Sequence, residues 1–237
     1  MIELMKLEIE KSAIRAYMYA GIIVTIAMIG LLYLFAYAPH IEPNDPDMLI
    51  FTNYTTVIGL YSVVNMAVFC VFSCVIYTQF IIEAYKGKQL ILLFSYPINR
   101  KKMLMAKLAV VAVMTSIFML SCNLIVFSIF SATESWMPIL ADTFSIAAAL
   151  HALKVTLIMI IAAVSLSIIA TGIGFCTKSV PSTIVAGVIL SSLYCNIAFH
   201  SLANDTVLLI AMVIAAMAGA ATTIILMNQV SKLEVLS

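Results

Sequence analysis

The sequence predicts an all-α, polytopic membrane protein with six transmembrane helices. Of its 237 residues, 64% are hydrophobic and 10% are charged, and the mean hydropathy is +1.16. An average soluble domain is about 45–50% apolar and about 25% charged, so this chain has too little polar surface to cover a water-soluble core. Soluble enzymes, nucleic-acid-binding proteins and secreted disulfide-rich domains are therefore excluded.

Six stretches reach the roughly 20 mostly apolar residues that a helix needs to cross the hydrocarbon core. The first resembles a signal peptide, but its apolar run exceeds the roughly 7–15 residues of a signal h-region, which indicates a retained anchor. Together the spans form one transmembrane domain, residues 1–237. The expected spans are 17–37, 57–82, 108–130, 153–175, 183–199 and 207–227.

The basic residues predict the orientation of these spans. Six spans place both termini on one side, and 11 of the 12 Lys and Arg residues fall on that side. Only Lys154 falls on the other side, together with six of the 11 acidic residues. By the positive-inside rule both termini are cytoplasmic. We expect Lys154 to be an interfacial anchor that faces Asp142 or a headgroup phosphate.

Two segments outside the spans have helical patterns. In residues 1–16, Ile2, Met5 and Ile9 share one helical face and charged residues another, which predicts an amphipathic helix on the inner membrane surface. The alternative is a plain charged flank that orients the first span. Residues 135–150, with a tryptophan and a run of alanines, predict a short helix at the outer interface.

The loop of residues 83–107, between the second and third spans, is too rich in apolar residues for a simple turn. Residues 89–94 are apolar but too short to span, and Pro97 ends this segment. Asn99 can cap a following helix that begins at Arg100. An apolar segment in the cytosol favours a helix that binds a partner. The alternative is that it lies against the spans of this chain.

At this loop the sequence resembles the type-two ABC exporter permeases. The order of an acidic residue, Lys-Gly, a leucine-rich stretch and Pro-x-x-Arg-Lys-Lys is similar to their first cytoplasmic loop, which couples to the ATPase. The length is similar to that of small bacitracin-resistance and lantibiotic-immunity permeases. Larger members carry a re-entrant helical pair between the last two spans, for which residues 201–206 leave no room. The implied coupling residues are Glu83, Lys86, Gly87, Leu90, Leu92, Phe94, Pro97 and Arg100.

The resemblance implies the permease subunit of an ATP-driven exporter in a bacterial plasma membrane. Its cargo would be an amphipathic peptide antimicrobial or a lipid-like compound. Its partners would be two cytoplasmic ABC ATPase subunits, which hold ATP and Mg, and a second permease, either a copy or a paralogue, within membrane lipid. No nucleic acid partner and no cofactor bound by this chain are expected. The alternatives are a non-transporting sensor or assembly protein, and an intramembrane enzyme with an unrecognised site.

Polar and small residues within the spans suggest further sites. Uncharged polar side chains there either line a translocation path or bond between helices, at about 0.6 kcal/mol each on average. These candidates are Asn65, Gln79, Asn123 and Asn196. In the last span a stripe of small residues permits close helix approach, either within the subunit or between two subunits. The stripe consists of Ala211, Ala215, Gly219 and Thr223.

Signatures of catalysis and of metal binding were sought in the sequence. It contains no HExxH, GxSxG or Walker A motif, and its three histidines have no paired spacing. Its five cysteines have no metal-ligand spacing and are expected to be small packing residues. No catalytic or metal-binding residue is therefore expected, and ATP hydrolysis is assigned to a separate subunit.

Overall fold

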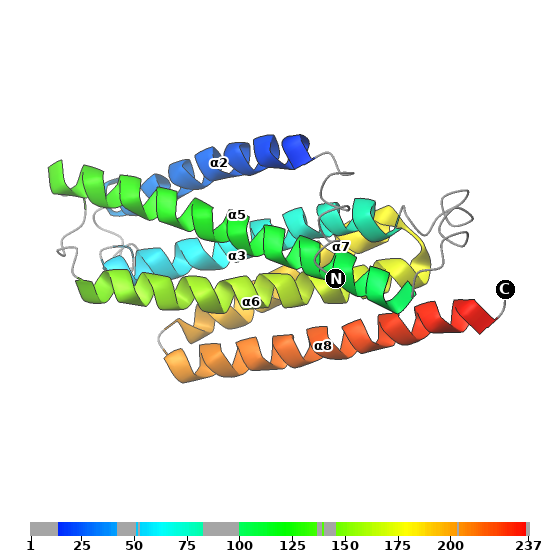
Figure 1. Ribbon diagram of the computed structural model, residues 1–237. Coiled ribbons are helices and arrows are strands. Elements are labelled where there is room, and N and C mark those ends of the chain that lie inside the picture. The colour runs from blue at the N-terminus through cyan, green and yellow to red at the C-terminus, as the bar shows by residue number, and fades with distance from the viewer. Residues whose placement is uncertain are drawn as a thin grey trace.

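The computed structural model describes residues 14–41, 51, 53–82, 100–136, 139, 146–202 and 204–235. Every regular element in these ranges is helical, and six helices are long and apolar enough to cross a membrane, as predicted. The elements are α2 (Ile14–Ile41), α3 (Tyr54–Tyr77) with the π-helical turn η2 (Thr78–Ile82), α5 (Arg100–Trp136), α6 (Ile146–Thr177), α7 (Val180–Ser201) and α8 (Asp205–Val235). Successive helices run in opposite directions, and α2 begins at the end of the bundle at which α8 ends (Figure 1).

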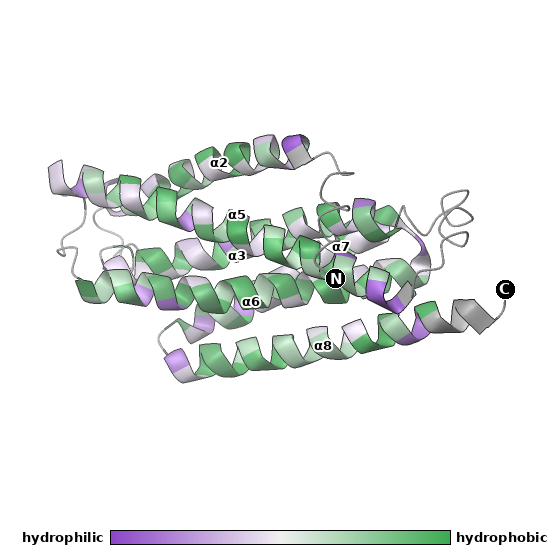
Figure 2. Ribbon diagram, in the orientation of Figure 1, coloured by the Kyte–Doolittle hydropathy of each residue, from purple (hydrophilic) through white to green (hydrophobic). Residues whose placement is uncertain are grey.

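The helices α3 and α6 form the centre of the bundle. Helix α3 packs against α2, α5, α6 and α7, and α6 packs against α3, α5, α7 and α8. In the most apolar part of α3, 67% of the residues are buried, whereas the corresponding figure is 17% for α2 and for α8. Apolar residues cover the helices along their length (Figure 2). The outward faces of α2 and α8 are therefore exposed and apolar, as contact with lipid requires.

Small residues bring the central helices close together. A Cβ added at Gly187 of α7 would lie 2.6 Å from the Sγ of Cys74 in α3, so only glycine fits this contact without movement. Cys70, Cys74 and Cys122 are buried and free, which agrees with a packing role. Between α6 and α7, Lys178 adopts a left-handed conformation with φ 50°, which closes a tight connection.

The helices extend beyond the apolar stretches that predict them. Helix α5 continues to Trp136, and α6 already begins at Ile146. The predicted interfacial helix over 135–150 is therefore wrong at both ends. Residues 135–136 belong to α5, and residues 146–150 belong to α6. Backbone hydrogen bonds within a helix are local, so they continue past the point at which the side chains cease to be apolar.

Two predicted cytoplasmic segments fall largely outside the described residues. Of the segment 1–16, only residues 14–16 are described, and they form the start of α2. Of the loop 83–107, residues 100–107 form the first turns of α5, and the helix begins at Arg100 as predicted.

Candidate functional site

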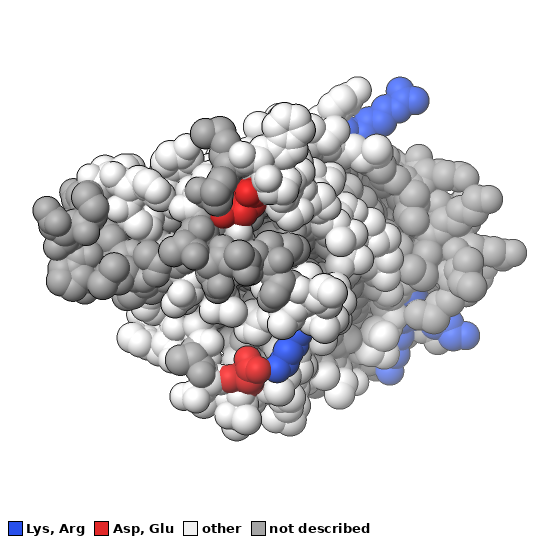
Figure 3. Space-filling model, turned by 90° about the vertical axis from the view of Figure 1, so that its left-hand side faces the viewer, with Lys and Arg blue, Asp and Glu red and all other residues white. Residues whose placement is uncertain are grey.

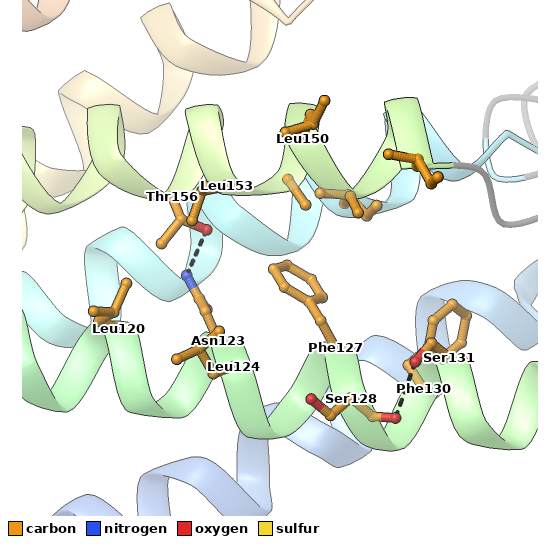
Figure 4. Close-up of a pocket in the computed structure, with 14 residues that line it drawn as sticks. Leu120, Asn123, Leu124, Phe127, Ser128, Phe130, Ser131, Leu150, Leu153 and Thr156 are labelled. Carbon is orange, nitrogen blue, oxygen red and sulfur yellow. Dashed lines mark hydrogen bonds between the residues drawn. The ribbon is translucent and has the colours of Figure 1, made fainter.

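A cavity of about 370 Å³ lies between α5 and α6, with α3 behind it (Figure 4). We call it the α5–α6 groove. Its volume is within the range of roughly 300–1,000 Å³ that is typical of ligand pockets. Its walls are mainly apolar and include Leu120, Leu124, Phe127, Leu150 and Leu153, and none of the described residues that line it is charged. This part of the groove can therefore hold an apolar group but offers no counter-ion to a charged one.

The groove is open on the side that faces away from the bundle. Leu124 and Leu150 are 56% and 63% exposed, whereas Asn123 and Thr156 are each only 2% exposed. Since α5 and α6 are long and apolar enough to cross a membrane, the exposed leucines at this opening suit contact with lipid. A ligand would enter it from the bilayer and meet the polar groups last.

The deep end of the groove is lined by Asn123 and Thr156, which form a buried polar cluster with Asn65 of α3. The Nδ2 of Asn65 donates a hydrogen bond of 2.6 Å to the Oδ1 of Asn123. The Nδ2 of Asn123 donates one of 3.0 Å to the Oγ1 of Thr156 (Figure 4). The cluster thereby joins α3, α5 and α6, as expected for polar side chains that bond between membrane helices.

The four polar candidates from the sequence do not form one path. Asn65 and Asn123 meet in the polar cluster, but Gln79 accepts a hydrogen bond from the hydroxyl of Tyr17 in α2. Asn196 is exposed on the outer surface of α7. Thr156 was missed by the sequence reasoning, because a threonine in an apolar span usually bonds to its own helix.

A second cluster of polar contacts surrounds η2, and we call it the π-turn junction. Lys107 of α5 is only 5% exposed, and its Nζ donates a hydrogen bond of 3.0 Å to the carbonyl oxygen of Phe80. Tyr17 of α2 bonds to Gln79 of the same turn. A π-helical turn leaves backbone groups displaced from the regular ladder, and side chains can then bond to them. Three helices are therefore tied together where α3 leads into residue 83.

The predicted coupling residues lie next to this junction in the sequence. Glu83, Lys86, Gly87, Leu90, Leu92, Phe94 and Pro97 lie outside the described residues. Arg100 is the first residue of α5. Lys107, the last residue of the predicted loop, lies within α5 and contacts the backbone of η2.

At the opposite end of the bundle, Lys154 forms an ion pair with Asp205. The Nζ to Oδ2 distance is 2.5 Å, and the two side chains are 44% and 48% exposed. The predicted partner Asp142 lies outside the described residues, and within them Lys154 pairs with the first residue of α8. Asp205 is 51 residues away in sequence, and only the packing of α8 on α6 brings it close.

The two ends of the bundle differ in charge. Glu134 and Asp205, together with Lys154, lie at the end where α5 finishes and α8 begins, and Figure 3 looks onto this end. Arg15 and Lys178 lie at the other end, with the basic residues at the start of α5. This segregation of the described charges is the one that the sequence predicts.

The small-residue stripe of α8 faces α6 of the same chain. Ala215 and Gly219 are buried, and a Cβ added at Gly219 would lie 3.2 Å from the Cα of Ser165. Ala211 and Thr223 are half-buried on the same side. Of the two alternatives for this stripe, packing within the subunit is the one that the structure contains.

Comparisons with known proteins identify a distant relative. The chain is 26% identical over 196 residues to the uncharacterized protein YcbO of Bacillus subtilis (strain 168), which covers 79% of this chain and 80% of that protein. No family model matches the sequence, and no solved structure matches it.

Proposed function

We propose that this protein is the permease subunit of an ATP-driven ABC exporter in a bacterial plasma membrane. It exports an amphipathic peptide or a lipid-like compound, and a separate cytoplasmic ATPase supplies the energy. Two ATPase subunits and a second permease complete the transporter. Both termini of this chain face the cytoplasm.

The α5–α6 groove is the observation that carries this proposal. A membrane protein with only a structural role has no need of a ligand-sized cavity that opens to lipid and ends in a buried amide and a buried hydroxyl. Polar groups within membrane spans are costly and are commonly retained where they line substrate pathways. A permease for an amphiphile requires this combination of an apolar channel and a few polar contacts.

The π-turn junction supports the assignment of the input side. It directly precedes the apolar loop that we expect to bind the ATPase, and it ties α3 to α2 and α5. A force applied at the loop would reach three helices together, because Lys107 and Tyr17 hold the same turn. Motion of the ATPase would thereby be transmitted to α5, which forms one wall of the groove.

Copurification tests the partner. A tagged wild-type chain extracted in mild detergent should retain an ATPase subunit, which mass spectrometry identifies and ATP hydrolysis measures. Leu92→Asp combined with Phe94→Asp should abolish this association, since burying unpaired charge at the contact costs a few kcal/mol. Leu92→Ile combined with Phe94→Leu is the matched control and should retain the ATPase.

Two outcomes would contradict the proposal. If the wild-type chain carries no ATPase, the sensor or assembly alternative replaces the exporter. If the Asp variant keeps the ATPase, the coupling loop is wrongly assigned. Both variants must reach the membrane in wild-type amounts for the comparison to count.

Orientation is tested by labelling single cysteines on a cysteine-free background. A cysteine in place of Lys88 should react with an impermeant maleimide only after the cells are opened. A cysteine in place of Asn204, which is exposed at the α7–α8 connection, should react in intact cells. Labelling of position 88 from outside would reverse the proposed topology.

A further inference from the structure

The chemistry of the α5–α6 groove points to a class of ligand. This inference rests on the proposed function only where it treats that ligand as the exported cargo. The groove extends along α5 from Leu120 to Ser131 and along α6 from Ile146 to Thr156. At about 1.5 Å rise per residue, this corresponds to a length of roughly 15 Å along the bundle. A narrow space of this length matches a single alkyl chain rather than a folded peptide.

The polar cluster retains hydrogen-bonding capacity at the deep end of the groove. Thr156 accepts a bond from Asn123, but within the described residues its own hydroxyl proton has no acceptor. The Oδ1 of Asn65, which is fully buried, has no hydrogen-bond partner among the described residues. A buried polar atom without a partner costs roughly 1–3 kcal/mol. A ligand that accepts from Thr156 would satisfy one of these groups.

The charge of the lining excludes several classes of ligand. Among the described residues, no Lys, Arg, Asp, Glu or His side chain lines the groove, and its deep end at Asn123 and Thr156 is formed by described residues. A cationic peptide or an anionic headgroup would therefore lose its hydration without gaining a counter-ion, at a cost far above that for a neutral hydroxyl or amide. The ligand must carry its hydrogen-bonding group without a formal charge.

We infer that the α5–α6 groove binds an uncharged, single-chain amphiphile. Its small polar head accepts a hydrogen bond from Thr156 and lies beside Asn123, and its alkyl chain lies along the leucine-lined wall. If the protein is an exporter, this compound represents its cargo class, and a cationic antimicrobial peptide does not enter this groove. The cluster of Asn65, Asn123 and Thr156 then serves both as a contact between helices and as the selective end of the site.

Photolabelling of the purified chain in lipid nanodiscs tests the inference without the ATPase. The probe is 1-dodecanol with a diazirine in its chain, and the matched probe is dodecyltrimethylammonium with the same diazirine. The alcohol should label Leu124, Leu150 and Leu153, and an excess of unmodified 1-dodecanol should compete. The ammonium probe, at equal concentration in the bilayer, should label only non-specifically. An excess of the unmodified ammonium compound should therefore not reduce its labelling.

Variants separate a hydrogen bond from general lipid contact. Thr156→Val should weaken competition by the alcohol about threefold to tenfold, the usual effect of losing one hydrogen bond. Thr156→Ser should restore it, and Thr223→Val, which removes a hydroxyl from α8, should leave it unchanged. Ala149→Trp, which fills the groove from an exposed position, should abolish saturable labelling.

The result that would overturn the inference is equal labelling by both probes, or competition that Thr156→Val leaves unchanged. If the ATPase copurifies but the groove shows no saturable labelling, this inference fails and the exporter function stands. If the groove labels as expected but no ATPase is found, the groove is a binding site on a membrane protein of another class.

Discussion

Gly187 of α7 packs directly on Cys74 of α3, and its substitution tests the packing of the bundle centre. A Cβ at this position would lie 2.6 Å from the Sγ and 3.4 Å from the Cβ of Cys74. Optimal contacts between heavy atoms are about 3.5–4.0 Å, so Gly187→Ala requires the sulfur to move by roughly 1 Å. Cys74 is fully buried, so its sulfur cannot move out toward the surface without displacing its neighbours.

The expected cost follows from this overlap. Overpacking of a well-packed core costs about 1–3 kcal/mol. For a chain of this size, 1 kcal/mol corresponds to a shift in Tm of about 2–4 °C, so Gly187→Ala should lower Tm by roughly 2–12 °C. Gly30→Ala is the matched control, because no atom lies within 4 Å of its added Cβ. The control should be neutral or stabilising, since alanine favours a helix over glycine by about 1 kcal/mol.

A second substitution should reverse the effect. Cys74→Ala alone removes a buried sulfur and leaves a small cavity, which is destabilising. In the double variant, the new Cβ at position 187 occupies the space of the missing sulfur, and a swap that conserves volume is tolerated best. The double variant should therefore unfold at a higher temperature than Gly187→Ala alone.

Thermal unfolding measures this cycle for the wild type, Gly187→Ala, Cys74→Ala and the double variant, with Gly30→Ala as the control. All are compared in one detergent by circular dichroism at a common heating rate. A coupling free energy of about 1–3 kcal/mol is expected between the two sites. Strictly additive effects, or a Gly187→Ala protein as stable as the Gly30→Ala control, would refute the packing of α7 on α3 at this contact.

Three further substitutions test separate contacts by the same unfolding measurement. Lys107→Met should destabilise the protein by about 1–3 kcal/mol, because the buried carbonyl of Phe80 loses its donor; equal stability would mean that the π-turn junction is not held by this bond. Lys178→Gly should stabilise it by about 1–2 kcal/mol, since glycine adopts a positive φ without penalty; a loss of stability would contradict the left-handed connection. Asp205→Asn should cost at most about 1 kcal/mol, because its ion pair with Lys154 is half-exposed, and the difference should shrink in high salt.

The sequence by itself determined the six spans and the segregation of charge, because both depend on local properties. A run of apolar residues long enough to cross the bilayer is visible without knowledge of any neighbour. The last residues of α5 and the first residues of α6 were not predicted, because apolarity marks the part of a helix within lipid and not the full extent of its hydrogen bonds.

Only the tertiary structure decided which residues meet. Periodicity showed that Gly219 belongs to a small-residue face, but only the packing of α8 on α6 placed that face against Ser165. The partner of Lys154 is likewise a residue that the order of the chain does not suggest. Among the four polar candidates, Asn65 and Asn123 bond to each other and the other two lie elsewhere. A polar side chain in a membrane helix needs a partner, but its own sequence does not specify which neighbouring helix supplies it.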